Sequence, residues 1–361
     1  MKLTRIDVAA GARTYPVQIA HGLIAKLASL VDDTTPSGGR FIVSNSTVWR
    51  LHGAAVKAAL PDAEVILIPD GERYKTLQTV GRIYEALIRA GADRQTTLVA
   101  VGGGVVGDIA GFAAATFLRG VAVVQVPTTL LGQVDSAIGG KVGVNHALGK
   151  NLIGAFHPPA AVLIDPDLLA TLPRREFRAG LYEVVKYGMI SSHDLFARVE
   201  RDLSDLFARK SRALEPVLAD CCRIKAAIVE ADEREAGPRR ALNFGHTIGH
   251  AIEAVTKYRR FRHGEAVGYG MLAAADLSER RRALTSDARQ SIADLITRMG
   301  PLPSVTDLSS KQIVETMKRD KKVVAGKLHF VLPSAIGAVT TVDDVTTRQI
   351  DGALRRLGLR R

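Results

Sequence analysis

Three residues with metal-ligating side chains stand in separate segments of the chain. Glu183 lies in Gly-Leu-Tyr-Glu-Val-Val-Lys-Tyr-Gly, His246 in Asn-Phe-Gly-His-Thr-Ile-Gly-His, and His263 in His-Gly-Glu-Ala-Val. Two imidazoles and a carboxylate hold zinc in catalytic sites and leave one coordination position for water or substrate. A structural zinc instead favours four ligands that usually include cysteine. If one divalent cation joins these three side chains, the protein is an enzyme.

A second histidine pair competes with this assignment. His250 follows His246 by four residues, so both imidazoles would lie on one face of a helix. Either histidine could also be an ordinary core residue, because a motif match is a hypothesis until its structural context is known. Spacing alone therefore leaves open which histidines would bind the cation.

A candidate nucleotide-binding motif lies in the first half of the chain. Gly102, Gly104 and Gly107 satisfy G-x-G-x-x-G after a strand-like run and at the start of a helical pattern, where backbone amides can hold a pyrophosphate. A Rossmann unit also places an acid about 20 residues downstream, but the available acids, Asp70 and Glu72, lie upstream. The alternative is that these glycines only let a helix pack closely on a strand.

A second glycine-rich stretch occupies residues 127–157 and carries cationic and amide side chains. Lys141, Lys150 and Asn151 lie within it. Glycine lets the backbone approach an anion closely, and lysine supplies a mobile charge. We expect a long loop that contacts an anionic ligand; a solvated flexible loop is the alternative.

Hydrophobic patterning indicates the elements that would position these residues. Five short apolar runs end in Gly, Pro, Ser or Asp, as buried parallel strands do. They are residues 40–44, 64–69, 97–101, 121–126 and 161–164. Helical candidates lie between them, such as residues 77–90, where Val80, Ile83, Leu87 and Ile88 recur at helical spacing. The alternation predicts an open α/β sheet that binds ligands beyond the carboxyl ends of its strands.

After about Pro173 the pattern becomes helical. Residues 195–207, 213–231 and 286–299 carry apolar side chains at three- and four-residue steps. Residues 328–332, followed by Pro333, favour a short strand or hairpin arm. We therefore predict an α/β Rossmann-like dinucleotide-binding domain over residues 1–173 and a mostly α-helical metal- and substrate-binding domain over residues 174–361.

Composition restricts the class of protein. The 361 residues are 47% apolar and 24% charged, which is ordinary for a globular protein of two domains. Arg5, Asp7 and Arg13 interrupt any apolar export signal, and no run is long enough to span a bilayer. The two cysteines, Cys221 and Cys222, are adjacent and give no disulfide framework. We expect a cytoplasmic protein with no membrane partner.

The basic charge balance suggests an anionic partner. Lys and Arg total 49 against 37 Asp and Glu, a formal charge of +12. The basic runs are short and aromatic residues make up only 5% of the chain, too few for a base-stacking platform. We attribute most of the excess to solvated helix faces and expect no nucleic-acid partner.

The chain resembles the 3-dehydroquinate synthase family of the sugar phosphate cyclase superfamily from Asp70 to Gly326. Several long motifs occur in the order expected for that family. They are residues 102–108, 134–141, 149–157, 183–186 and 242–250. The resemblance implies a dehydroquinate synthase-like fold.

The family's activity is a lyase reaction of the shikimate pathway, which leads to chorismate and the aromatic amino acids. It converts 3-deoxy-D-arabino-heptulosonate 7-phosphate to 3-dehydroquinate and phosphate. NAD oxidises one ring alcohol transiently, phosphate is eliminated, the hydride returns, and an intramolecular aldol step closes the carbocycle. The resemblance also implies that the substrate's own phosphate removes the proton, so that positioning supplies much of the rate enhancement.

The resemblance assigns ligands residue by residue. It makes Glu183, His246 and His263 the ligands of one zinc or cobalt ion and leaves His250 beside the substrate, as a proton relay or hydrogen-bond donor. Substrate-binding and catalytic positions are Lys141, Lys186, Lys225, Arg239, Asn243, His250, Arg119, Asn151, Lys321 and Lys322. Arg119 would reach in from a neighbouring subunit of a homodimer.

Cofactor positions follow from the same resemblance and gather around the glycine motif and its neighbours. They are Asp70, Gly71, Glu72, Arg73, Tyr74, Lys75, Gly104, Val105, Val106, Gly107, Asp108, Thr128, Thr129, Asp135, Lys141, Lys150, Leu168, Leu169, Ala170 and Thr171. Asp135 and Lys141 would lie where NAD and substrate meet.

Departures from the family pattern are few. Ala137 and Val142 stand where many relatives carry hydroxyl residues, and one residue is inserted in the run 257–263, where it could alter the placement of His263. Rival interpretations are a sister cyclase, such as an inosose or valiolone synthase, and an iron-type polyol dehydrogenase that would release NADH. Lys225 and Arg239, which suit a carboxylate, argue for the synthase.

Overall fold

The computed structural model describes residues 3–11, 13–235, 237–318, 323–324 and 327–361. The chain forms two compact units: unit 1 comprises residues 1–173 and 211–234, and unit 2 comprises residues 174–210 and 235–361. The division into domains after residue 173 stays a prediction. Residues 211–234, which it placed in the second domain, lie in unit 1.

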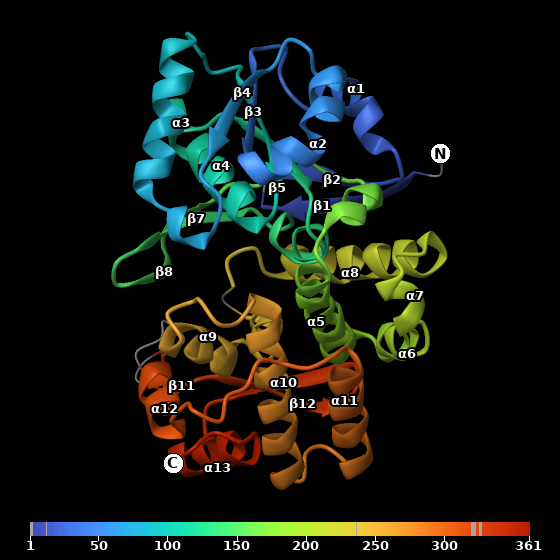
Figure 1. The fold of residues 1–361 in the computed structure, drawn as a ribbon, viewed down its shortest axis with the longest axis vertical. Coiled ribbons are helices and arrows are strands. Elements are labelled where there is room, and N and C mark those ends of the chain that lie inside the picture. The colour runs from blue at the N-terminus through green and yellow to red at the C-terminus, as the bar shows by residue number, and fades with distance from the viewer. Residues whose placement is uncertain (1–2, 12, 236, 319–322, 325–326) are drawn as a thin grey trace. The chain divides into compact units, whose positions relative to one another are not determined.

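Unit 1 is built on a seven-stranded sheet (Figure 1). Its order is β1 (Thr4–Ala10), β2 (Arg13–Ile19), β9 (Ala161–Ile164), β6 (Ala122–Pro127), β5 (Thr97–Gly102), β3 (Arg40–Asn45) and β4 (Glu64–Ile68). All neighbours pair in parallel except β1 and β2, which are antiparallel. The five predicted strands are confirmed. The β1–β2 pair was not predicted, because β1 is half exposed and carries Arg5 and Asp7.

Helices cover both faces of this sheet. They are α1 (Leu27–Asp32), α2 (Ser46–Ala59), α3 (Leu77–Arg89), α4 (Gly104–Thr116) and α8 (Ser211–Ala231), with short 3-10 turns η1 (Leu23–Lys26), η2 (Glu72–Tyr74), η3 (Phe117–Arg119) and η5 (Pro166–Thr171). Leu98 and Ala100 of β5 join the core cluster under α3 and α4, whereas Val99 and Val101 join the cluster under α1 and α2. This period of two is the alternation of a strand between its faces. Ile88 of α3, which the helical pattern placed on the apolar face, is 67% exposed.

The second glycine-rich stretch is not the predicted loop. After a π-helical turn η4 (Gly132–Ser136) it forms an antiparallel hairpin of β7 (Lys141–His146) and β8 (Gly149–Phe156). A Cβ atom on Gly143 would lie 2.6 Å from the Ile153 carbonyl oxygen, and one on Gly154 would lie 2.5 Å from that of Val142. These two glycines therefore serve close strand pairing.

Unit 2 is mainly helical, as predicted. Its helices are α5 (Arg174–Ser191), α6 (His193–Arg201), α7 (Leu203–Phe207), η6 (Pro238–Asn243), α9 (His246–Val255), α10 (His263–Arg280), α11 (Ser286–Arg298), α12 (Ser310–Lys318) and α13 (Thr347–Arg356). Two small hairpins pair β10 (Val323–Val324) with β11 (Lys327–Leu328), and β12 (Phe330–Ala335) with β13 (Ala338–Val342). The strand expected to end at Pro333 continues to Ala335, and its pairing register shifts there. Among the described residues, no helix combines the length and apolar character that a membrane span requires.

Candidate active site

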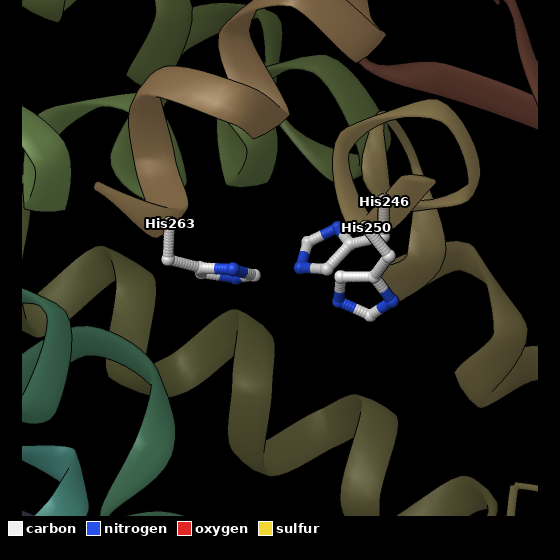
Figure 2. A group of neighbouring side chains, drawn as sticks. All are labelled: His246, His250 and His263. Carbon is white, nitrogen blue, oxygen red and sulfur yellow. The ribbon is translucent and has the colours of Figure 1, made fainter. Parts of the chain in front are cut away.

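Three histidines meet between α9 and α10 of unit 2 (Figure 2). One ligand nitrogen of each of His246, His250 and His263 lies within 4.8 Å of the others. The ring centroids are 5.1 Å apart for His246 and His263 and 5.4 Å apart for His246 and His250. The structure thus brings His250 and His263, the two candidate partners of His246, into one cluster with it.

Glu183 of α5 joins this cluster from the protein interior. Its Oε1 atom lies 3.6 Å from Nε2 of His246 and 3.5 Å from Nε2 of His263. The side chain is fully buried, and Lys186 Nζ lies 2.5 Å from Oε2. Apart from this ion pair, neither carboxylate oxygen has a hydrogen-bond partner in the part of the chain that the structure describes.

Hydrogen bonds at Nδ1, the ring nitrogen that does not face Glu183, orient the imidazoles of His246 and His263. Nδ1 of His246 lies 3.0 Å from the Phe244 carbonyl oxygen, and Nδ1 of His263 lies 3.1 Å from Oε2 of Glu253. A carbonyl and an ionised carboxylate only accept hydrogen bonds, so Nδ1–H donates in both rings. In the neutral rings Nε2 therefore carries the lone pair that faces Glu183. Acceptors that converge in this way repel one another unless a cation lies among them, so the three side chains fit a divalent metal.

Glycines let the three supporting helices approach closely enough to assemble this cluster. A Cβ atom on Gly264 of α10 would lie 1.9 Å from the Ala179 carbonyl oxygen of α5, and one on Gly270 would lie 1.8 Å from the Gly245 carbonyl oxygen before α9. Gly245 itself has φ of 75°, which favours glycine. In the run before His263, Lys257 and Tyr258 adopt left-handed backbone with φ of 53° and 55°, and His263 still reaches the cluster.

A buried carboxylate fixes the start of α10, where His263 is the first residue. Glu265 accepts hydrogen bonds from Arg175 at 2.7 Å, from Arg178 at 3.1 Å and from the backbone amide of Arg262 at 2.9 Å. Burial alone would raise the pKa of Glu265, but these donors hold the pKa below its ordinary value. The carboxylate remains ionised and ties α5 to α10.

The glycine motif of unit 1 follows β5 and opens α4, as predicted. A Cβ atom on Gly102 would lie 2.6 Å from Val106, and one on Gly107 would lie 2.7 Å from Oε1 of Gln125. The close-packing explanation therefore applies to these two glycines. Gly104 begins α4, and a small cavity at this end of β5 is lined by Gly102 to Gly104, Gly107, Gln125, Pro127, Gly132, Ser136 and Ala137. Backbone amides at this helix N-terminus fit the pyrophosphate of a dinucleotide.

The predicted cofactor residues near η2 contact the β7–β8 hairpin within unit 1. Lys75 forms an ion pair with Asp108 of α4 and donates to Asn151 Oδ1 at 2.5 Å. Glu72 Oε1 lies 3.6 Å from Lys150 Nζ. Lys150 and Asn151 of the hairpin thus share one network with Glu72 and Lys75 of residues 70–75, which we call the cofactor segment.

Other predicted cofactor residues lie in the segments that follow the carboxyl ends of the sheet strands. Asp70 accepts from Asn45 and Thr47, and Gly71, with φ of 107°, directly precedes η2. Arg73 lies over the ring of Tyr74 at 4.6 Å. The remaining ones are Val105 and Val106 in the first turn of α4, Thr128 and Thr129 after β6, and Leu168, Leu169, Ala170 and Thr171 in η5, where Thr171 bonds to His52.

The predicted substrate residues are divided between the two units. In unit 1, Lys225 of α8 pairs with Asp135, whose carbonyl oxygen also accepts from Nζ at 3.0 Å. In unit 2, Arg239 is buried and Asn243 donates to Glu235 at 2.6 Å. Lys141 begins β7 and Arg119 ends η3, both exposed. Lys321 and Lys322 lie outside the described residues.

Two residues beside the site escaped the sequence prediction. Glu253 follows His246 by seven residues and His250 by three, so the helical spacing already placed it on their face. Asn145 of β7 donates to Glu72 Oε1 at 2.9 Å and accepts from the Asn151 amide at 3.0 Å. No spacing in the sequence marks Asn145.

Ala137 and Val142, the two expected departures from the family pattern, are both buried. Ala137 is 7% exposed and Val142 is 8% exposed. Val142 packs on α4, where a Cβ atom on Gly111 would lie 2.3 Å from its Cγ1. An apolar side chain satisfies this position without a hydrogen-bond partner.

Comparison with known proteins gives consistent relationships. Residues 65–179 match the family described as 3-dehydroquinate synthase N-terminal, and residues 180–323 match 3-dehydroquinate synthase C-terminal. A 3-dehydroquinate synthase of Dichelobacter nodosus (strain VCS1703A) is 47% identical over 354 residues, which cover 97% of this chain and 95% of that protein.

Solved structures of sugar phosphate cyclases share the fold. A 2-epi-5-epi-valiolone synthase of Streptomyces hygroscopicus subsp. jinggangensis 5008, with NAD+ and Zn2+ bound, has a TM-score of 0.87 and 32% identity over 97% of this chain and 98% of its own. A 2-deoxy-scyllo-inosose synthase, complexed with carbaglucose-6-phosphate, NAD+ and Co2+, has a TM-score of 0.88 and 28% identity over 98% and 100%. With both family regions matched and a relative of this identity over nearly its whole length, the chain belongs to the 3-dehydroquinate synthase family.

Proposed function

We propose that Glu183, His246 and His263 hold one divalent cation and that His250 lies beside the substrate. The observation that carries this proposal is the approach of two Nε2 atoms to within 3.5 and 3.6 Å of one Glu183 oxygen. Two imidazoles and a carboxylate leave a coordination position for a ligand. His250 shares the cluster but is not needed to complete this set of three.

The protein is a lyase that converts 3-deoxy-D-arabino-heptulosonate 7-phosphate to 3-dehydroquinate and phosphate, in the shikimate pathway. When bound, NAD accepts and returns a hydride, and a zinc or cobalt ion supplies Lewis acidity. The ring alcohol that is oxidised regains its hydride, so NAD is not consumed. The chain's own residues must bind, orient and shield the substrate through these stages.

Cationic and amide side chains suit the two anionic groups of this substrate, a carboxylate and a phosphate. We propose Lys225, Arg239 and Asn243 as binding residues, together with Lys141, Lys150, Asn151 and Lys186. Arg239 is only 1% exposed, and a buried guanidinium is well suited to hold a carboxylate or phosphate through paired donors. Lys225 and Lys186 are also buried cations, and each already faces a carboxylate.

We also propose a homodimer in the cytoplasm. Arg119 is exposed, with φ of 71°, at the end of the turn after α4, where it could serve a neighbouring subunit. Cys221 and Cys222 are both buried thiols, which suits a reducing compartment. Light scattering of the purified protein measures the oligomeric state directly.

Turnover of defined sugar phosphates tests the assigned reaction. The holoenzyme, with zinc or cobalt and catalytic NAD, is given 3-deoxy-D-arabino-heptulosonate 7-phosphate, and phosphate, NADH absorbance and the carbocyclic product are followed. One dehydroquinate per phosphate without NADH accumulation is expected. Turnover only of another sugar phosphate would assign a sister cyclase, and stoichiometric NADH from a polyol would assign a dehydrogenase.

A further inference from the structure

We propose that Glu253 is a positioning residue for His263 and thereby sets the metal affinity of the site. This inference rests on the proposed ligand set of Glu183, His246 and His263. Glu253 acts through His263, because its carboxylate contacts Nδ1 while the opposite nitrogen, Nε2, faces Glu183. Glu253 therefore supports a ligand and is not itself one.

The contact is close and lies in the protein interior. Oε2 of Glu253 is 3.1 Å from Nδ1 of His263, and the Glu253 side chain is only 4% exposed. The His263 side chain is 28% exposed, so the carboxylate approaches the ring from its protected side. A carboxylate that accepts from Nδ1–H fixes both the ring orientation and the tautomer, and it makes Nε2 a stronger donor to a metal.

Burial of the Glu253 carboxylate in α9 costs free energy unless an interaction such as its contact with His263 compensates the charge. Glu253 shares a face of the helix with His246 and His250, seven and three residues earlier, and its side chain is almost fully buried. Removing a carboxylate from water costs several kcal/mol unless the charge is compensated. An apolar side chain would satisfy this face of α9 more cheaply, so the acid is explained better by the imidazole it contacts than by the stability of the helix.

The two proposed histidine ligands are held by different kinds of partner. His246 donates to the carbonyl oxygen of Phe244, a backbone group that no side-chain substitution removes. His263 is held through the side chain of Glu253. One ligand can therefore be loosened by mutation while the orientation of the other is left intact.

The test measures zinc affinity of the NAD-loaded protein by competition with a chromophoric chelator. Glu253→Leu removes the acceptor and keeps an apolar side chain of similar size, whereas Glu253→Gln keeps an amide oxygen that can accept from Nδ1–H. Loss of a partner that orients a metal ligand typically weakens metal affinity about 10- to 100-fold. We expect a loss of about this size for the leucine variant and a smaller loss for the glutamine variant.

Three controls separate positioning from a structural effect. Glu315→Gln alters an exposed glutamate of α12 in the same unit and should keep wild-type zinc affinity. The metal-free Glu253→Leu protein should unfold at a temperature no lower than that of the wild type, and its NAD affinity should be unchanged. If the leucine variant fails to fold, zinc affinity of the glutamine variant decides, and a wild-type value there overturns the inference.

Failure of this inference can be told apart from failure of the ligand set. If His263→Ala loses zinc while both Glu253 variants bind zinc as tightly as the wild type, only the role of Glu253 is overturned. If His263→Ala itself keeps wild-type zinc affinity, the proposed ligand set is wrong. A lower unfolding temperature of the metal-free variants with unchanged zinc affinity would make Glu253 merely structural.

Discussion

Lys186 neutralises Glu183 one turn away on α5, with Nζ 2.5 Å from Oε2 and both side chains almost inaccessible to solvent. The pair leaves the other oxygen, Oε1, directed at His246 and His263. A buried carboxylate without compensation costs several kcal/mol. The lysine therefore allows the proposed metal ligand to remain charged within the core before a cation arrives.

Removing this lysine should destabilise the metal-free protein. Lys186→Met leaves the Glu183 carboxylate buried without its cation, a change that costs about 3–5 kcal/mol when one partner of a buried pair is deleted. Zinc should then restore more stability to the variant than to the wild type. Thermal unfolding with and without zinc measures both effects. Lys210→Met, which breaks an exposed pair with Asp205, should change stability by no more than about 1 kcal/mol; equal effects of the two substitutions would contradict this account.

Asn145 should couple the hairpin to the cofactor segment. Asn145→Ala removes its hydrogen bonds to Glu72 and to the Asn151 amide. Each hydrogen bond contributes about 0.5–1.5 kcal/mol. Losing both should therefore weaken NAD binding roughly tenfold or more. Calorimetric titration with NAD tests this. His146→Ala, an exposed neighbour in β7, serves as the control, and NAD affinities that match in all three proteins would refute the coupling.

Helix contact at Gly270 should be intolerant of a single methyl group. Gly270→Ala places Cβ 1.8 Å from the Gly245 carbonyl oxygen, so α10 must move away from α9, at a cost of about 1–3 kcal/mol or more. Metal binding should fall with stability because the two helices carry the histidines. Gly81→Ala is the matched control, since no atom lies within 4 Å of its Cβ and a helix gains about 0.5–1 kcal/mol from alanine. Urea unfolding that ranks both variants alike would count against this packing argument.

The stability of unit 1 should depend on pH through His21. Its Nδ1 lies 2.5 Å from Asp167 and its Nε2 lies 3.0 Å from Glu215. Burial alone would lower the pKa of His21, but the hydrogen bond to Asp167 and the charges of Asp167, Glu215 and Asp165 together raise it. A raised pKa in the folded state stabilises the protein fully below the unfolded value of about 6.5, and this contribution is lost as pH rises through the folded pKa.

The substitution His21→Gln isolates this contribution. The difference in unfolding free energy between wild type and variant should be largest near pH 5.5 and should shrink toward pH 8.5. Denaturant titrations across this range provide the measurement. A difference that stays constant, or grows on the alkaline side, would show that protonated His21 is not the source.

The sequence predicts β3, β5, β6 and β9 well because each is almost entirely buried and reads as one apolar run. It also predicts β4, whose run is apolar although most of this edge strand is only partly buried or exposed. It does not reveal β1, whose polar residues alternate on a half-exposed edge. The glycines of residues 127–157 predict a loop, but they also allow the strands β7 and β8 to pair closely, and the structure forms this hairpin. The two differences have separate causes: β1 lacks an apolar run, whereas glycine suits both a loop and close strand pairing.

The candidate site shows a similar limit. Helical spacing associates His246 with His250 and could have included Glu253, but it cannot bring in Glu183 from α5 or His263 from α10. Those contacts depend on tertiary packing at Gly264 and Gly270. The family resemblance supplied the ligand set that residue spacing left open.

Metal content of single-residue variants distinguishes the proposed ligand set of Glu183, His246 and His263 from a site of three histidines. Wild type, His250→Ala, His263→Ala and Glu183→Gln are loaded with zinc, dialysed and measured for zinc per chain by mass spectrometry. We expect one zinc in the wild type and in His250→Ala, and almost none in His263→Ala or Glu183→Gln. Loss of zinc from His250→Ala with retention in Glu183→Gln would contradict the proposed ligand set and assign the cation to the three histidines.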